Sequence, residues 1–498
     1  FSINFNQIQE KLKDGNFNTD SLMDVLKTQD SVFVLLKDFD LRQPLLAFVK
    51  NSSTMMAGKD LLSGFVASIS DRADLEKNLK NLYPDKNIEK GKNASYIQLK
   101  DNTYAAWNDA FMISLVGSAL TADQVDALFA MKKDASIADN KEAVNLLTVK
   151  SDLSFYVNGN GSLASIPFIS MSKASDLIKD NYGGGTINFE KGKVLFDAKY
   201  YLNGTLTDLI KKNPTKDLAG DGLKHFPGKP LGFFEVSFNL KQILSFLEYA
   251  GVKNTADVYL KNMGLSLDDL QKAFVGEINV ALSDVGVTTQ SIPFGDTSLT
   301  INRPEPKVLV NIPIADKASY DKIVTALGTV GLFVNQNGQW VPKELIDPSK
   351  GVYIANNKSV IFATDKTLAD AFLSGSKSIE YPKDLDRKNK TSIGYVDLGK
   401  MIQAMSRSGQ NQDSSLQLAI QTFDDVSMSA DNIKGNVCSY TMVLHLKDQS
   451  KNSLPVLMEF VKKNDLLNKA KKSAETLDDS MNTNIQPPPS MNQPDSGK

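Results

Sequence analysis

Residues 234–238 alternate apolar and polar side chains, which places Phe234, Val236 and Phe238 on one face of a β-strand. Directly behind them, residues 240–247 carry apolar side chains at helical spacing, and Asn239 is a residue type that often caps helices. Residues 1–8 combine the same two patterns. We therefore predict a strand that runs into a helix near the start of each half of the chain.

Further motifs recur in the same order in both halves, at an offset of roughly 235 to 250 residues. In each half, the pattern predicts a strand, an acidic helix cap, a helix, a hairpin turn and another capped helix, in that order. The matched positions are Asp71 and Asp316, Asn93 and Asn337, Thr121 and Thr367, and the strands 194–202 and 440–446. Proteins with mixed helices and strands repeat such units anyway, but chance recurrence would not keep the spacing. We therefore predict a tandem duplication.

The duplication sets the expected domain boundaries. Residues 1–215 and 231–465 are the two predicted repeats, and the Gly- and Pro-rich segment 216–230 is the predicted linker. Residues 466–498 lack apolar periodicity and are rich in Pro, Asn and Ser, which predicts a flexible tail. Strands that alternate apolar and polar residues favour an antiparallel sheet with one wet face. The predicted class is α+β, with a mainly antiparallel sheet and helices packed on one face in each repeat.

The composition narrows the possible partners. The chain is 41% apolar and 23% charged, as in ordinary soluble proteins. It carries 56 Lys and Arg against 58 Asp and Glu, and this balance argues against a nucleic-acid partner, which requires a basic face. No apolar stretch approaches the roughly 20 residues that span a bilayer. The chain begins at Phe1 within a strand pattern, from which we expect that an upstream segment has been removed.

Cysteine and histidine are too scarce for most catalytic or metal sites. The single cysteine, Cys438, excludes an intrachain disulfide and is predicted to be a buried or half-buried thiol at the start of a strand. His225 is predicted to be exposed in the linker, and His445 to face solvent opposite Leu444 and Leu446. The pattern predicts no catalytic, cofactor-binding or metal-binding residues, no cofactor, and two dispensable histidines.

Two local motifs invite a functional interpretation but have simpler explanations. Ser170-Met-Ser-Lys173 has the Ser-x-x-Lys spacing of penicillin-recognising enzymes, as does Ser374-Gly-Ser-Lys377, but the other motifs of those enzymes do not accompany them. Gly183–Gly185 precede a strand and not a helix, so we predict a flexible turn and not a phosphate-binding loop.

Aromatic residues occupy matching regions of the two halves. Their side chains either form an exposed platform for sugars or peptides, or fill the core beside the predicted hairpins. We favour the core. These residues are Tyr96, Tyr104, Trp107, Trp340 and Tyr353.

The order of these motifs is similar to that of a known protein family. Residues 1–8 and 234–247, the predicted hairpin 353–362 and the helix 368–373 carry the resemblance. The chain resembles domain of unknown function 4836, a family of exported lipoproteins from gut bacteria of the Bacteroidetes phylum. The resemblance implies an export signal and a lipid-anchoring cysteine upstream of residue 1. It provides no catalytic residues.

Two functions remain open at this point. The first is a non-enzymatic binding or scaffolding lipoprotein, exported to the periplasm or to the outer-membrane surface, with a glycan, peptide or protein as its ligand. Its only membrane attachment would be the implied lipid anchor. The second is a hydrolase of envelope or dietary polymers that uses carboxylates. A close carboxylate pair in a cleft with a raised pKa would favour the hydrolase, and an aromatic-lined groove without such a pair would favour the binding protein.

Overall fold

The computed structural model describes residues 1–15, 31–51, 61–117, 120–159, 173–294, 297–382, 385–406 and 414–465. The predicted tail, residues 466–498, lies outside them. In the first half the strands are β1 (Ser2–Ile3), β2 (Leu45–Asn51), β3 (Leu61–Ser68), β4 (Glu89–Lys90), β5 (Ser95–Lys100), β6 (Thr103–Trp107), β7 (Phe111–Gly117), β8 (Leu153–Asn158), β9 (Tyr182–Glu190) and β10 (Lys193–Tyr201). The α-helices there are α1 (Phe5–Asp14), α3 (Arg72–Leu82), α4 (Ala122–Phe129), α5 (Lys141–Thr148) and α7 (Gly204–Lys212), and the 3₁₀ turns are η1 (Ser31–Asp38), η2 (Lys133–Ala135), η3 (Ile137–Asp139) and η4 (Lys173–Leu177).

The second half contains an equally varied set of elements. Its strands are β11 (Gly232–Ser237), β12 (Glu277–Phe294), β13 (Thr297–Pro313), β14 (Phe333–Gln336), β15 (Gln339–Pro342), β16 (Val352–Ala355), β17 (Ser359–Ala363), β18 (Lys390–Asp397), β19 (Phe423–Asp431) and β20 (Val437–Leu446). Its helices are α8 (Leu240–Tyr249), α9 (Lys253–Asn262), α10 (Leu267–Ala273), α11 (Lys317–Thr329), α12 (Lys366–Ser374), α13 (Leu398–Ser406), α14 (Ser414–Thr422) and α15 (Ser453–Lys463), with 3₁₀ turns η5 (Lys343–Leu345) and η6 (Pro348–Lys350).

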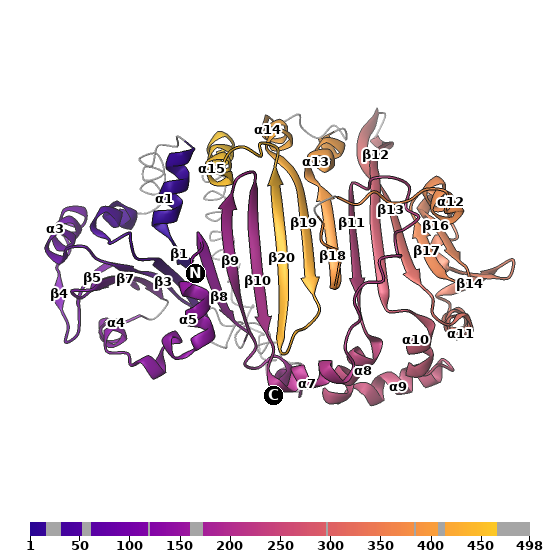
Figure 1. The fold of residues 1–498 in the computed structure, drawn as a ribbon, viewed down its shortest axis with the longest axis horizontal. Coiled ribbons are helices and arrows are strands. Elements are labelled where there is room, and N and C mark those ends of the chain that lie inside the picture. Colours follow the sequence, from indigo (N-terminus) through magenta and orange to yellow (C-terminus); the bar gives the residue numbers. More distant parts are fainter. Residues whose placement is uncertain are drawn as a thin grey trace, which may run out of the picture.

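Eighteen of the described strands form one continuous antiparallel sheet that runs along the whole molecule (Figure 1). The strand order is β4-β5-β6-β7-β3-β2-β1-β8-β9-β10-β20-β19-β18-β11-β12-β13-β17-β16. Strands β10 and β20 pair at the centre, and on either side of them the order is mirrored: β9 by β19, β8 by β18, β1 by β11, and outward to β6 and β16. The α+β class with a large antiparallel sheet is therefore confirmed.

The mirrored order is the arrangement that a tandem duplication predicts, although the duplication itself remains a prediction. Asp71 caps α3 by accepting hydrogen bonds from the amides of Ala73 and Asp74, and Asp316 caps α11 in the same way. These helices follow the mirrored strands β3 and β13.

Other matched positions differ in detail. Thr121 caps α4, whereas the cap of α12 is Asp365, and Thr367 is the second residue of that helix and not its cap. Asn337 lies in the turn of the β14–β15 hairpin, which forms a separate two-stranded sheet, while Asn93 precedes β5 of the main sheet.

Helices cover both faces of the sheet at its two ends, where the sequence predicted one covered face. In the first half, Leu75 and Leu79 of α3 pack in one core and Val125 of α4 in another. Successive residues of β6 enter these different cores, Ala106 beside α4 and Trp107 beside α3. Because neighbouring strand residues point to opposite faces, the two helices lie on opposite sides of the sheet.

Residues 216–230, the predicted linker, connect α7 to β11 and pack against the second half. Leu223 and Phe226 are fully buried in a core with strands β11, β12, β13 and β17. The backbone amide of Ala219 donates to a carboxylate oxygen of Glu277 at 2.7 Å. The segment therefore covers part of the sheet, while the domain boundaries remain a prediction.

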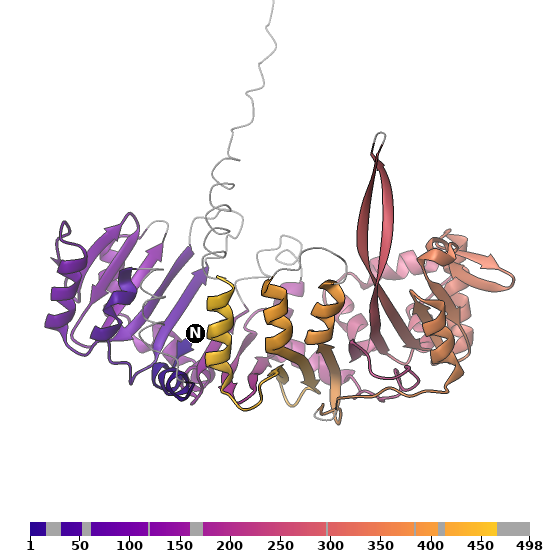
Figure 2. The same cartoon turned by 90° about the horizontal axis from the view of Figure 1, so that it is seen from above.

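The six central strands, β8, β9, β10, β20, β19 and β18, expose a wide sheet surface between the helices at their ends. Figure 1 shows α13, α14 and α15 at one end of these strands and α7 at the other, with α8 and α9 below the neighbouring strands β11 and β12. Figure 2 shows the outer part of the β12–β13 hairpin projecting from one side of the sheet. Within the described residues, no helix is long and apolar enough to cross a membrane.

Candidate functional site

The candidate residues named from the sequence do not gather in one place. Cys438 is half-buried at the start of β20, as predicted, and burial raises the pKa of its thiol. His225 is exposed, also as predicted. Within the described part of the chain, no three His, Cys, Asp or Glu side chains are grouped so that they could hold a metal ion.

The prediction that His445 faces solvent needs correction. Its side chain is 23% exposed, and its Nδ1 lies 2.7 Å from Oδ1 of Asp425, which the neighbouring strand β19 supplies. Strand β19 was not predicted from the sequence, and Asp425 lies beside His445 only because β19 and β20 pair as an antiparallel hairpin.

The Ser-x-x-Lys motifs acquire no support from the fold. Ser170 lies outside the described residues. The hydroxyl of Ser374 donates to the carbonyl oxygen of Ala371 at 2.8 Å and lies 2.8 Å from the Ser376 hydroxyl, so these are its partners and not Lys377.

The aromatic residues of the matching regions fill cores, as favoured from the sequence. Trp107 is fully buried, and its indole nitrogen donates to Glu76 at 2.9 Å. Tyr104 is also buried. Tyr96, Trp340 and Tyr353 pack as partly buried members of the surrounding cores.

A groove that the sequence did not predict lies on one face of the central sheet, which we call the apolar face. Its floor is the start of β9, where Gly183 and Gly185 lie in register between β8 and β10. The prediction that these glycines form a turn was therefore wrong. A Cβ on Gly185 would lie 2.1 Å from the carbonyl oxygen of Asp197, so a side chain there would force the strands apart.

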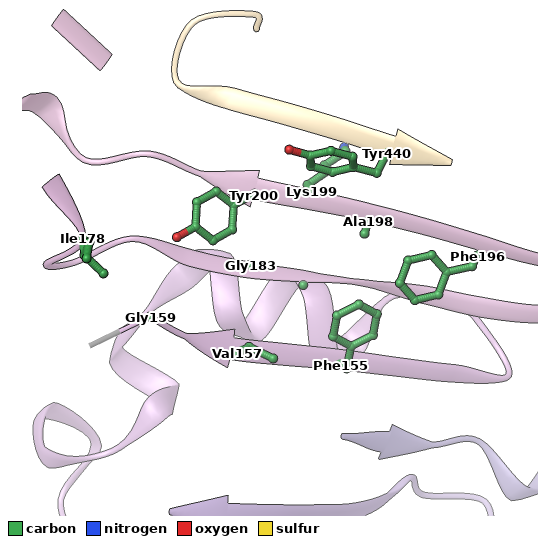
Figure 3. A pocket seen from close by; sticks show the side chains of 11 residues that line it. Phe155, Val157, Gly159, Ile178, Gly183, Phe196, Ala198, Lys199, Tyr200 and Tyr440 are labelled. Atoms are coloured by element: carbon green, nitrogen blue, oxygen red, sulfur yellow. The ribbon is translucent and has the colours of Figure 1, made fainter. Parts of the chain in front are cut away.

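Aromatic and aliphatic side chains form the walls of this groove (Figure 3). The rings of Phe155 on β8 and Phe196 on β10 stack across β9 with their centroids 5.5 Å apart. Val157, Tyr200 and Tyr440 line the rest of the groove, and Ile178 lies at its end. The cavity has a volume of about 500 Å³, within the size range of small-ligand pockets.

The apolar face continues beyond the groove across β20, β19 and β18 to β11. Met442, Met428 and Phe234 lie on this face, because they occupy the registers that follow Phe196 across the sheet. Their exposed fractions are 41%, 37% and 40%, and that of Tyr440 is 46%. Burial raises the pKa of Tyr440, so its hydroxyl stays uncharged at neutral pH. The apolar face is therefore wide, and the row of residues that runs across it from Phe196 to Phe234 carries no charged side chain.

The carboxylate pair that would favour a hydrolase exists, but it lies elsewhere and under cover. Glu235 is fully buried on β11, and burial raises its pKa despite a 2.6 Å hydrogen bond from the Tyr381 hydroxyl. Glu277 on β12 is 4% exposed and lies diagonally across from Glu235, and its carboxylate accepts a hydrogen bond from the backbone amide of Ala219. Neither residue lines the groove, so a polymer substrate in the groove would not reach them.

Signals for the groove were present in the sequence but were ambiguous. The run Gly183–Gly185 was interpreted as a turn, and residues 153–157 alternate as in any half-buried strand. Only the pairing of β8, β9 and β10 brings Phe155, Gly183 and Tyr200 together.

Comparison with known families identifies the chain. A family model described as "Domain of unknown function (DUF4836)" matches residues 38–300, more than half of the chain. The chain belongs to this family, which confirms that part of the predicted resemblance. The match does not extend to the bacterial origin or to the lipoprotein nature. Searches of curated proteins and of solved structures found no significant match.

Proposed function

We propose that this member of the DUF4836 family is a non-catalytic binding protein whose apolar face holds apolar segments of other polypeptides. The observation that carries the proposal is the glycine-floored aromatic groove, which opens onto exposed apolar residues of the same sheet face. Monomeric soluble proteins rarely expose a wide contiguous apolar surface unless it serves for binding.

The chemistry of the groove favours a polypeptide ligand. Exposed methionines adapt their shape to different apolar side chains, and Met428 and Met442 extend the surface next to Tyr440. Phe155, Phe196 and Tyr200 supply rigid aromatic anchors, which contribute most of the binding energy in many interfaces. An extended segment would place alternate side chains in the groove, because its side chains alternate like those of a strand.

Binding can be tested with a fluorescent hexapeptide of alternating Leu and Thr residues, measured by anisotropy. Tyr200 and Tyr201 are neighbours on β10 and point to opposite faces, so they form a matched pair of variants. We expect Tyr200→Ala to weaken binding about tenfold or more, as is typical for an aromatic anchor, and Tyr201→Ala to leave it unchanged. Phe196→Ala provides a second variant in the wall.

Equal binding by wild type, Tyr200→Ala and Phe196→Ala would refute the role of the groove. Mass spectrometry of the peptide after incubation tests the alternative, a carboxylate-dependent hydrolase. Cleavage that Glu235→Gln abolishes would establish that alternative and contradict the non-catalytic proposal.

The proposed location is the cell envelope, after export and through a lipid anchor. This part rests on the family resemblance alone, and it is tested separately from the groove. Expression of the full-length gene product in its native host, followed by membrane fractionation and protease treatment of intact cells, should recover the chain with the membrane fraction. Recovery in the cytoplasmic fraction would refute the location while leaving the binding test unaffected.

A further inference from the structure

A second groove lies on the opposite face of the same central strands. One wall is α5, which supplies Glu142, Asn145 and Leu146. The other is the sheet, where Thr186, Asp197, Lys199, Tyr201, Ser439 and Thr441 line the cavity from β9, β10 and β20. Its volume is about 480 Å³, close to that of the apolar groove.

Stacked tyrosines form one end of this second groove. The rings of Tyr201 and Tyr182 stack with centroids 4.7 Å apart and an interplanar angle of 13°. Tyr156 lies next in the row, 5.9 Å from Tyr182. Tyr201, which lines the cavity, is therefore a braced aromatic surface with little freedom to move.

The polar side chains of the second groove offer every kind of hydrogen-bonding group. Glu142 and Asp197 accept, Lys199 donates, and the Asn145 amide and the Thr186 and Ser439 hydroxyls do both. Within the described part of the chain, the side chains of Glu142, Asn145 and Lys199 form no hydrogen bond or ion pair, whereas Asp197 accepts one from Thr441 at 2.8 Å. Several of these groups are thus available to a ligand.

This combination selects among ligand classes. Two carboxylates against one ammonium disfavour a phosphate, and Glu142 lies in the first turn of α5, where an anion would otherwise be favoured. An apolar ligand would leave the charged groups without partners. Each sugar hydroxyl both donates and accepts, and the apolar face of a sugar ring stacks on an aromatic side chain.

We propose that the second groove binds a carbohydrate, with a sugar ring stacked on Tyr201 and its hydroxyls hydrogen-bonded to Asp197, Lys199 and Glu142. The site lies on the opposite face from the proposed polypeptide groove, although Ala198, Lys199 and Tyr440 line both cavities. One molecule thereby has an apolar binding face and a polar one, separated by the thickness of a single sheet.

Ligand-observed NMR with maltotriose, cellotriose and chitotriose as probes tests the site on the full chain. We expect saturation transfer to at least one of the three sugars. Tyr201→Ala should abolish it, and Asp197→Asn, which keeps the shape and the acceptor for Thr441, should weaken it about tenfold, as expected when a charged hydrogen bond is lost. Tyr200→Ala, on the other face, should bind the sugar like the wild type.

Absence of transfer to all three sugars would overturn the proposal, as would sugar binding that persists in both Tyr201→Ala and Asp197→Asn. Thermal denaturation of each variant separates loss of binding from loss of folding, and the conservative Asp197→Asn keeps the test informative if Tyr201→Ala unfolds. Release of shorter sugars by the wild type would support the carbohydrate site and contradict only the non-catalytic function proposed above.

Discussion

The mirrored strands of the two halves are covered by different elements and carry different side chains beneath them. In the second half, three buried polar residues lie opposite one another in register on β11, β12 and β13: Glu235, Asn279 and Asn311. The mirrored strands β1, β2 and β3 carry in register on the same face Ser2, Leu46 and Val66. Only the second half thus has a continuous buried polar row.

The covering element explains the difference. Over the first half lies α4, whose Val125 packs in a core with Val66 and whose backbone bonds are satisfied within the helix. Over the second half, the segment 216–230 packs in the same core as α12, the counterpart of α4, and it contains turns and an isolated bridge to Ile379 but no helix or sheet ladder of its own. Asn311 donates to the carbonyl oxygen of Gly222 at 2.7 Å, and Glu277 accepts from Ala219. Asn311 of the polar row and the nearby Glu277 thus pair backbone groups of this irregular segment with the sheet. The other two members of the row have other partners: Glu235 accepts from the Tyr381 hydroxyl, and Asn279 donates to the carbonyl oxygen of Asn311.

The largest expected effect comes from removing the apolar anchor of this segment. Phe226→Ala empties a fully buried site, and such substitutions typically cost about 3–5 kcal/mol of unfolding free energy. We expect hydrogen exchange to accelerate in β11, β12 and β13 and to remain slow in β2, β3 and β7. Val157→Ala, at a residue that is 54% exposed, is the control and should change little.

Equal acceleration of exchange in both halves would break the comparison. It would show that the continuous sheet opens as one cooperative unit, in which the covering elements do not stabilise their halves separately.

The sequence predicted the local features of both halves better than their covering. Asp71 and Asp316 were identified as caps because a cap bonds to amides two or three residues away. The strand-to-helix transitions at Asn4 and Asn239 follow from equally local signals. Those local signals recur in order, and the predicted class and antiparallel sheet follow from them.

Features that depend on distant pairing were not predicted. Gly and Pro residues in 216–230 indicated a linker, yet Leu223 and Phe226 of that segment are buried, because an apolar residue in an irregular segment shows no periodicity. Nothing in the local sequence pairs β10 with β20, a contact between residues about 240 positions apart that brings Tyr440 to the apolar groove and Ser439 and Thr441 to the second groove. The grooves thus arise from topology and could not be read from motifs.

The next effect concerns the charge state of the polar row. Burial raises the pKa of Glu235, so the folded protein holds this proton at a higher pH than the unfolded chain does. The stabilisation from this proton is complete below the unfolded pKa of about 4.3 and is lost as pH rises through the folded pKa. Glu235→Gln mimics the protonated group and should gain stability relative to wild type as pH rises from 4.5 to 8.

Urea denaturation at several pH values measures this difference, with a slope of at most about 1.4 kcal/mol per pH unit. Glu344→Gln, at an exposed position on η5, is the matched control and should change the unfolding free energy by less than about 0.5 kcal/mol. A constant difference between wild type and Glu235→Gln over the whole range would mean that Glu235 is ionised throughout. The polar row would then hold a buried charge and not a neutral donor.

The smallest expected effect separates the buried contacts of the segment from its exposed side chains. His225 is exposed and directly precedes the buried Phe226. Its substitution therefore tests whether an unburied residue of the segment contributes to the stability of the fold. We expect His225→Ala to change the unfolding free energy by less than about 0.5 kcal/mol, as for other exposed sites.

His445→Ala should cost somewhat more, up to about 1 kcal/mol, because His445 is partly buried and pairs with Asp425 at 2.7 Å. Both variants should bind the peptide and the sugar probes like the wild type, since neither histidine lines a groove. If His225→Ala lowered the unfolding free energy nearly as much as Phe226→Ala, the exposed side chains of the segment would stabilise the fold as much as its buried ones.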